Sequence, residues 1–275
     1  MSTTCDDRKA LFRGLVDDAA MVPPGNASPE VAIAEHLVHR QAWYAELVGP
    51  LLVQASRWGT FAAAHVTAGQ PPLDVVLIGA LEPPGPVPEG VRMVGVELPV
   101  ASPPLPDSPP QQLLACEIAS TTQGYRVLSE VALAHAGGRH VIAKFRTGGT
   151  SADTFPDDHA LADVLMTAVE LGAPLKLTAG LHHAVRRRDP VTGFEHHGFL
   201  NVLVAVEAAQ AGAPADTVGR LLDERDGARL AALVTGWSVT QVTTVRDGFV
   251  SFGCCGVVDP VADLVELGLV VPEKP

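Results

Sequence analysis

Short apolar runs rich in β-branched residues alternate with polar turns and longer segments of helical periodicity along most of the chain. Eight such runs have the length and flanking residues of single strands. They cover Gly14–Ala19, Leu51–Ala55, Asp74–Ile78, Arg92–Leu98, Leu113–Ala119, His140–Arg146, Pro174–Gly180 and Phe249–Cys254. Alternating strands and helices are typical of a parallel sheet, so the pattern predicts an α/β fold, a (β/α)8 TIM barrel.

Several segments between these runs have recognisable helix ends. Ser28-Pro29-Glu30 combines an N-cap serine, a proline in the first turn and an acid, which predicts a helix reaching about Val48. Two proline-rich segments, 82–90 and 102–110, are predicted to be barrel loops, because proline lacks the amide donor that a helix needs. Apolar spacing predicts further helices over Gln123–Ala136, Asp157–Leu171, Phe199–Ala211, Asp216–Leu233 and Asp259–Leu267.

The chain of 275 residues is slightly longer than a typical barrel of about 250 residues. We interpret residues 1–275 as one barrel domain, with residues 182–198 as a polar insert that folds over the seventh strand as a lid. The alternative is a doubly wound open sheet, because parallel strands alone do not prove that a barrel closes.

Composition and charge narrow the function classes. Apolar residues make up 47% of the chain, enough for a large core, and the net charge of −12 argues against nucleic acid as a partner. The one basic run, Arg186-Arg187-Arg188, is predicted to be a solvated turn. Four cysteines, including the adjacent Cys254-Cys255, fit a reducing compartment better than a disulfide framework.

No stretch approaches the roughly 18 continuous apolar residues of a membrane span. Residues 1–8 include two acids and lack the design of a signal peptide. We therefore expect a cytoplasmic protein with no membrane partner. A homo-oligomer stays possible, because helices outside a barrel often pair.

Candidate chemistry lies at the carboxyl ends of the predicted strands, where barrels carry their sites. Lys144 and Arg146 lie on the sixth strand, and Lys176 and Thr178 on the seventh. Because side chains alternate between the two faces of a strand, each pair shares one face, and the opposite face of each strand is apolar. By elimination, both lysines point into the barrel.

Two inward lysines on neighbouring strands have two interpretations. They could form structural ion pairs, for example with Glu97 on the fourth strand and Glu117 on the fifth. Alternatively, two close ammonium groups disfavour each other's charge, which lowers the pKa of one of them toward neutrality. A neutral lysine attacks carbonyl carbons and forms a Schiff base, and Asp17, Asp74 or Glu117 is available to move protons.

Five short motifs occur in an order that resembles the deoxyribose-phosphate aldolases, which are Schiff-base barrels. Leu15-Val16-Asp17-Asp18 stands in place of that family's first-strand motif, and Asp74-Val75-Val76 matches its third strand. Lys144-Phe145-Arg146-Thr147-Gly148-Gly149 and Lys176-Leu177-Thr178-Ala179-Gly180 are similar to its two lysine segments. Gly253-Cys254-Cys255-Gly256 stands where the family has a glycine and two serines.

The resemblance implies roles for four residues and a reaction without a cofactor. Lys144 would form the Schiff base and Lys176 would lower its pKa, while Asp74 would shuttle protons and Asp17 would support it. No glycine pattern of a dinucleotide site or a P-loop occurs. The implied activity is that of a lyase of the aldolase type.

Departures from the family pattern bear on the substrate. Arg146 puts a second cation at the mouth of the barrel, and the glycines that cradle phosphate in the family are reduced to Ala179-Gly180. A guanidinium binds a carboxylate or a phosphonate bidentately, so we expect a small anionic carbonyl compound. The predicted substrate-binding residues are Arg146, Thr178, Gly148, Gly149, His182, His183, Glu97 and Gly253.

A histidine-rich loop suggests competing functions. Two histidines and a carboxylate often bind a catalytic metal, although the spacing here matches no known ligand signature. Adjacent histidines in an extended segment point to opposite sides. A metal-dependent hydrolase or isomerase is therefore one alternative, and a non-catalytic anion-binding barrel is another; our preferred interpretation requires neither a metal nor a cofactor. The loop carries His182, His183, Glu195, His196 and His197.

Overall fold

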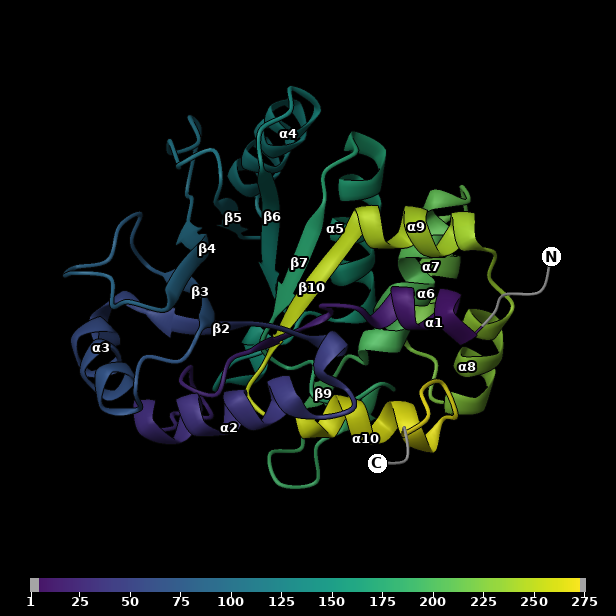
Figure 1. The fold of residues 1–275 in the computed structure, drawn as a ribbon. Coiled ribbons are helices and arrows are strands. Elements are labelled where there is room, and N and C mark those ends of the chain that lie inside the picture. The colour runs from purple at the N-terminus through teal and green to yellow at the C-terminus, as the bar shows by residue number, and fades with distance from the viewer. Residues whose placement is uncertain (1–4, 273–275) are drawn as a thin grey trace.

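The computed structural model describes residues 5–272 and contains a closed barrel of eight parallel strands (Figure 1). Around the barrel the strands follow the order β1-β10-β7-β6-β5-β4-β3-β2. Each of the eight barrel strands overlaps one of the predicted runs, and closure of the sheet confirms the (β/α)8 barrel and excludes the open sheet. The strands are β1 (Val16–Asp18), β2 (Val48–Gln54), β3 (Leu73–Ile78), β4 (Val91–Pro99), β5 (Leu113–Ile118), β6 (Val141–Arg146), β7 (Leu175–Thr178) and β10 (Phe249–Cys254).

Helices cover the outside of the barrel (Figure 1). Their buried faces form the main core against the outward side chains of the strands; helix α4, for example, buries Val127, Leu128 and Val131. Short 3-10 turns lie at Ala45–Leu47, Ala55–Arg57 and Ala152–Thr154. The helices are α1 (Cys5–Phe12), α2 (Pro29–Gln41), α3 (Trp58–Thr67), α4 (Thr122–Ala136), α5 (Asp158–Leu171), α6 (Phe199–Gln210), α7 (Ala215–Leu222), α8 (Gly227–Thr235), α9 (Val239–Gly248) and α10 (Val258–Glu266).

Some helix boundaries differ from the prediction. Helix α2 ends at Gln41 instead of near Val48, because Ala42 is extended and a 3-10 turn then leads into β2. The helix predicted over Asp216–Leu233 is two helices, since the Asp226 side chain caps a new start at α8. Helices α1, α3 and α9 were not predicted.

Loops at the carboxyl ends of the strands shape the mouth of the barrel. The proline-rich connections from β3 to β4 and from β4 to β5 contain no helix, as predicted. In the loop between β7 and α6, an antiparallel hairpin of β8 (Arg187–Arg188) and β9 (Glu195–His196) lies within the predicted insert. Among the described helices, none has the length and apolar character needed to cross a membrane.

Candidate functional site

Two lysines occupy neighbouring positions inside the barrel. Lys144 on β6 and Lys176 on β7 are partners in the parallel register, and each is only 2% exposed. The inward direction predicted from side-chain alternation is therefore confirmed. In an interior that excludes water, two ammonium groups require compensating charge.

Three carboxylates provide that charge, and with the lysines they form what we call the lysine–carboxylate cluster: Asp17, Glu97, Glu117, Lys144 and Lys176. Lys144 Nζ lies 2.6 Å from Glu97 Oε2 and 2.9 Å from Glu117 Oε2. Lys176 Nζ lies 2.5 Å from Asp17 Oδ2 and also contacts Glu97 Oε1. Glu97 thus bridges the two lysines, and each ammonium group has two carboxylate partners.

The cluster reverses one expected pKa shift. Burial alone would lower the pKa of Lys176, but Asp17 and Glu97 outweigh burial and raise it. Burial likewise opposes the charge of Glu97, yet the two lysines lower its pKa to about 2. Repulsion between the lysines was predicted to lower the pKa of one of them. Lys176 is not that lysine, because the carboxylate between the two ammonium groups replaces repulsion with attraction.

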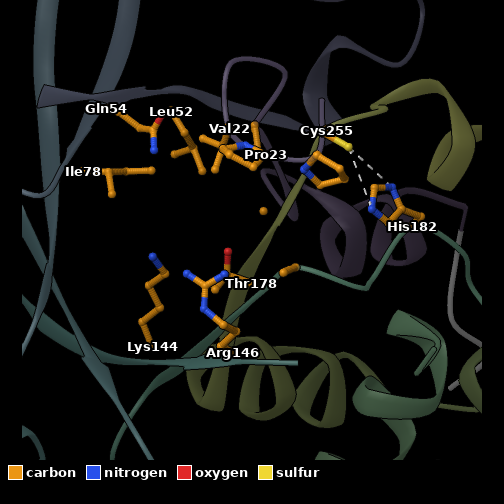
Figure 2. Close-up of a pocket in the computed structure, with 14 residues that line it drawn as sticks. Val22, Pro23, Leu52, Gln54, Ile78, Lys144, Arg146, Thr178, His182 and Cys255 are labelled. Carbon is orange, nitrogen blue, oxygen red and sulfur yellow. Dashed lines mark hydrogen bonds between the residues drawn. The ribbon is translucent and has the colours of Figure 1, made fainter. Parts of the chain in front are cut away.

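An inner cavity opens above Lys144 and separates the roles of the two lysines. In Figure 2, Lys144 and Arg146 point into one space that Val22 and Pro23 close from the opposite side. Lys176 is absent from the lining and lies beneath, among carboxylates. The cavity measures about 550 Å³ with its open mouth and is lined by Ala19, Val22, Pro23, Pro24, Leu52, Gln54, Ile78, Lys144, Arg146, Thr178, Ala179, His182, Gly253 and Cys255.

An outer cavity adjoins the inner one at the loops. The two share five lining residues, among them Arg146 and His182, so they are continuous at the barrel mouth. The outer cavity is lined by Pro23, Pro24, Arg146, Gly149, Thr150, Thr154, Phe155, Ala179, Gly180, His182 and His196.

Arg146 is held differently from the buried lysines. Its side chain is 48% exposed, and its Nε and Nη2 atoms both lie 3.4 Å from Glu117 Oε1. Glu117 therefore contacts Lys144 through one oxygen and Arg146 through the other. Because a guanidinium can bind a carboxylate bidentately, the half-exposed Arg146 is the candidate residue for binding an anionic group in this cavity.

Most of the predicted site residues come together at the barrel mouth. Thr178 and Gly253 line the inner cavity, and Gly149 lines the outer one. Gly148 lines neither cavity but touches the next loop: a Cβ atom there would lie 3.0 Å from the Cα of Gly180.

Asp74 does not belong to the site, contrary to the predicted role as proton shuttle. It lies at the amino-terminal start of β3, where its carboxylate forms an ion pair with Arg92 at 2.5 Å. Along the same face of β3, Val76 and then Ile78 separate it from the inner cavity. The Asp-Val-Val motif matched the family, but it does not fix where along the strand the aspartate lies. Asp74 lies at the end of β3 opposite to the cavity, so it cannot act there.

The paired histidines point to different sides, as the alternation predicted. His182 and His196 line cavities, whereas His183 Nδ1 lies 3.1 Å from Asp263 on α10 and lines neither cavity. His183 is therefore misplaced for its predicted role in binding substrate. Within residues 5–272, no group of three His, Cys, Asp or Glu side chains is placed to hold a metal ion.

His197 and Arg186 lie inside the loop instead of facing solvent. His197 accepts a hydrogen bond from Arg186 at its Nδ1 (3.1 Å), and its Nε2 donates to the Pro156 carbonyl (2.8 Å). Arg186 also lies 3.1 Å from Asp223. The prediction of a solvated arginine turn is wrong for Arg186 and correct for Arg187 and Arg188, which are largely exposed.

Several residues of the site were not predicted. Ser251 on β10 donates a hydrogen bond to Asp17 at 2.8 Å, and Gln54 lines the inner cavity at the end of β2. The Cys255 Sγ lies 3.9 Å from His182 Nε2 at the cavity wall (Figure 2). Ser251 and Gln54 could have been found from the sequence, because each is a polar residue inside an otherwise apolar strand.

Comparisons with known proteins assign no family to this chain: no protein-family model and no curated protein matches it. The resemblance to the deoxyribose-phosphate aldolases therefore stays a hypothesis based on its short motifs.

Proposed function

We propose that the protein is a Schiff-base lyase of the aldolase type, acting on a small anionic carbonyl compound with Lys144 as the nucleophile. One observation carries the proposal: of the two buried lysines, Lys144 lines the inner cavity and Lys176 does not. A carbonyl group entering from the mouth would meet the Lys144 amine, while Lys176 stays enclosed by Asp17 and Glu97.

The scarcity of lysine supports a chemical use. The chain contains four lysines, at positions 9, 144, 176 and 274, in a sequence of 275 residues. Two of these four are register partners inside the barrel, where a lysine is costly to bury. Ordinary packing would favour apolar residues at both positions.

The proposed reaction uses the carboxylates around Lys144. To attack a carbonyl carbon, its ammonium group must first lose a proton, and Glu117 at 2.9 Å is a partly exposed acceptor. The amine adds to the carbonyl, water leaves, and the resulting iminium carries the positive charge that the ammonium carried before. Glu97 and Glu117 can stabilise that cation in the same place.

Cleavage then follows from the iminium as an electron sink. The electron pair of an adjacent carbon–carbon bond moves toward the iminium nitrogen and forms an enamine as the bond breaks. A base takes the proton released from the departing fragment, and a later protonation of the enamine carbon regenerates the iminium for hydrolysis. Arg146, which lines the same cavity, would hold the anionic group of the substrate.

Binding of an anion without catalysis is the competing function. It is favoured by the observation that each buried ammonium group already contacts two carboxylates, as in a structural ion-pair network.

Reductive trapping distinguishes the two functions. The protein is incubated with aldehydes, ketones and 2-oxo acids, treated with borohydride, and mapped by peptide mass spectrometry. We expect a stable adduct on Lys144 that requires both the carbonyl compound and the reductant. The variant Lys144→Arg should lose the adduct, while Lys9→Arg, changed in α1, should retain it. An adduct that maps only to Lys9 or Lys274, or persists in Lys144→Arg, would contradict the proposal.

A further inference from the structure

The outer cavity is built by three loops that converge beside the inner cavity. Pro23 and Pro24 follow β1, the segment from Gly149 to Phe155 follows β6, and His182 and His196 lie after β7. Loops at the carboxyl ends of barrel strands are the usual place for ligand contacts. The outer cavity is thus positioned to receive the part of a substrate that extends beyond the reacting carbonyl.

The charged side chains that line the two cavities favour an anionic ligand. Within the described residues, neither lining contains an Asp or Glu, although acidic residues outnumber basic ones in the whole chain. Burial lowers the pKa of His182 and His196, so both rings are neutral near pH 7. Arg146 is therefore the fixed positive charge of the outer cavity, and it also lines the inner one.

Arg146 lies near the proposed nucleophile. Glu117 contacts Lys144 with one carboxylate oxygen and Arg146 with the other, so one carboxyl group spans both cations. A carbonyl group at Lys144 and a carboxylate at Arg146 can therefore belong to adjacent carbons of one small molecule. This arrangement fits a 2-oxo acid, whose ketone and carboxylate are directly bonded.

The remaining surface of the outer cavity suits a flat apolar group. The Phe155 ring packs against the His196 ring, with ring centroids 4.7 Å apart and planes inclined by 36°. Pro23, Pro24 and Ala179 add further apolar surface. Apolar walls with a few fixed polar groups are typical of small-molecule sites, and aromatic rings favour ring-bearing ligands.

The backbone around this cavity is held in an unusual conformation. Ala179 has a φ of +62°, which is rare for a residue with a side chain, and it lines both cavities. Gly180 follows with a φ of +80°, and a Cβ atom there would lie 2.7 Å from the Thr147 carbonyl oxygen. Backbone strain of this kind is concentrated at functional sites.

We propose that the substrate is a 2-oxo acid with a ring-bearing tail, its carboxylate bound by Arg146 and its ring held in the outer cavity against Phe155. The inference rests on the proposed function, because it places the 2-oxo group at Lys144. It adds a specificity site that lies outside the lysine–carboxylate cluster.

Phenylpyruvate and pyruvate are the probes, since they share the 2-oxo acid and differ by one ring. We expect phenylpyruvate to be trapped on Lys144 at a concentration at least tenfold lower than pyruvate requires. Phe155→Ala should lower phenylpyruvate trapping far more than pyruvate trapping, and so remove most of this preference. Phe155→Leu is the conservative variant and should retain part of it. Thr150→Trp, which fills the outer cavity from an exposed position, should likewise reduce phenylpyruvate trapping more than pyruvate trapping.

Binding of phenyllactate, measured by calorimetry, separates this inference from the proposed function, because its hydroxyl group cannot form an imine. Phenyllactate binding that Phe155→Ala or Arg146→Gln weakens at least fivefold, without trapping of any carbonyl compound, would support the outer site and contradict the lyase. Equal trapping of pyruvate and phenylpyruvate, unchanged in Phe155→Ala, would support imine chemistry and overturn the inference. Failure of both phenylpyruvate trapping and phenyllactate binding would also overturn it.

Discussion

At the scale of single residues, side-chain direction was easier to predict than position along the barrel axis. Alternation within β6 and β7 was sufficient to turn Lys144 and Lys176 inward, and Glu97 and Glu117 were recognised as partners. Which of the two lysines faces the cavity depends on the stagger between neighbouring strands, and this stagger could not be predicted from the sequence. Asp74 shows the same difficulty, because its motif matched while its place at the start of β3 did not.

Within the lysine–carboxylate cluster, removing the charge of Glu97 should lower the stability of the protein the most. Glu97→Gln keeps the shape of the side chain but removes the charge that both lysines contact. Breaking a buried ion pair leaves an uncompensated charge, so we expect a loss of about 3 kcal/mol in the free energy of unfolding, measured by urea denaturation. Asp74→Asn is the control, since it breaks a pair at an exposed position. A similar loss in the two variants would contradict the role given to Glu97.

At the scale of elements, strands were predicted more reliably than helices and loops. Strands with an apolar outer face form short runs that are mostly apolar, and such runs identified all eight barrel strands. The excursion between β7 and β10 was harder, because the helical periodicity continues across the break where Asp226 starts α8. The paths of the loops could not be predicted. No local sequence feature indicates the positive φ of Ala179, because that angle depends on how the loops after β6 and β7 pack together.

Gly180 and Gly172 form a matched pair for testing how closely the loops after β6 and β7 pack. Both have positive φ angles, but a Cβ atom on Gly172 at the end of α5 would meet nothing within 4 Å, whereas one on Gly180 would meet the Thr147 carbonyl. We expect Gly172→Ala to lower the free energy of unfolding by about 1 kcal/mol and Gly180→Ala by about 2–4 kcal/mol. Carbonyl trapping should fall in Gly180→Ala alone. Equal effects on stability and trapping would show that the loops tolerate the extra atom.

At the scale of the whole molecule, the cluster ties distant parts of the chain together. The first strand pairs with the last, and Asp17 contacts both Lys176 and Ser251 across 159 and 234 positions of sequence. Composition and strand count were enough to predict a barrel. Closure itself depends on such long-range contacts, and β1 has only three residues with which to make them. The interior therefore contributes to the closed fold as well as to the proposed chemistry.

Global stability should also depend on pH through the loop between β7 and α6, which contributes His182 and His196 to the outer cavity. Burial lowers the pKa of His197 to about 4, against an ordinary value of about 6.5. Between these values the unfolded chain binds the proton and the folded protein does not, so stability is lost as the pH falls from 6.5 toward 4. The shift corresponds to about 3 kcal/mol.

The variant His197→Gln isolates this contribution because it cannot titrate. Urea unfolding of the wild-type protein at several pH values between 7 and 4 should give a steep fall in the free energy of unfolding, and the variant a shallower one. The slope should not vanish, because burial also lowers the pKa of His39, His182 and His196, which act with the same sign. Calorimetry near pH 5 should detect proton uptake on unfolding, and less of it in the variant. Identical slopes and proton uptake would mean that His197 is already protonated in the folded protein, which its hydrogen bond from Arg186 opposes.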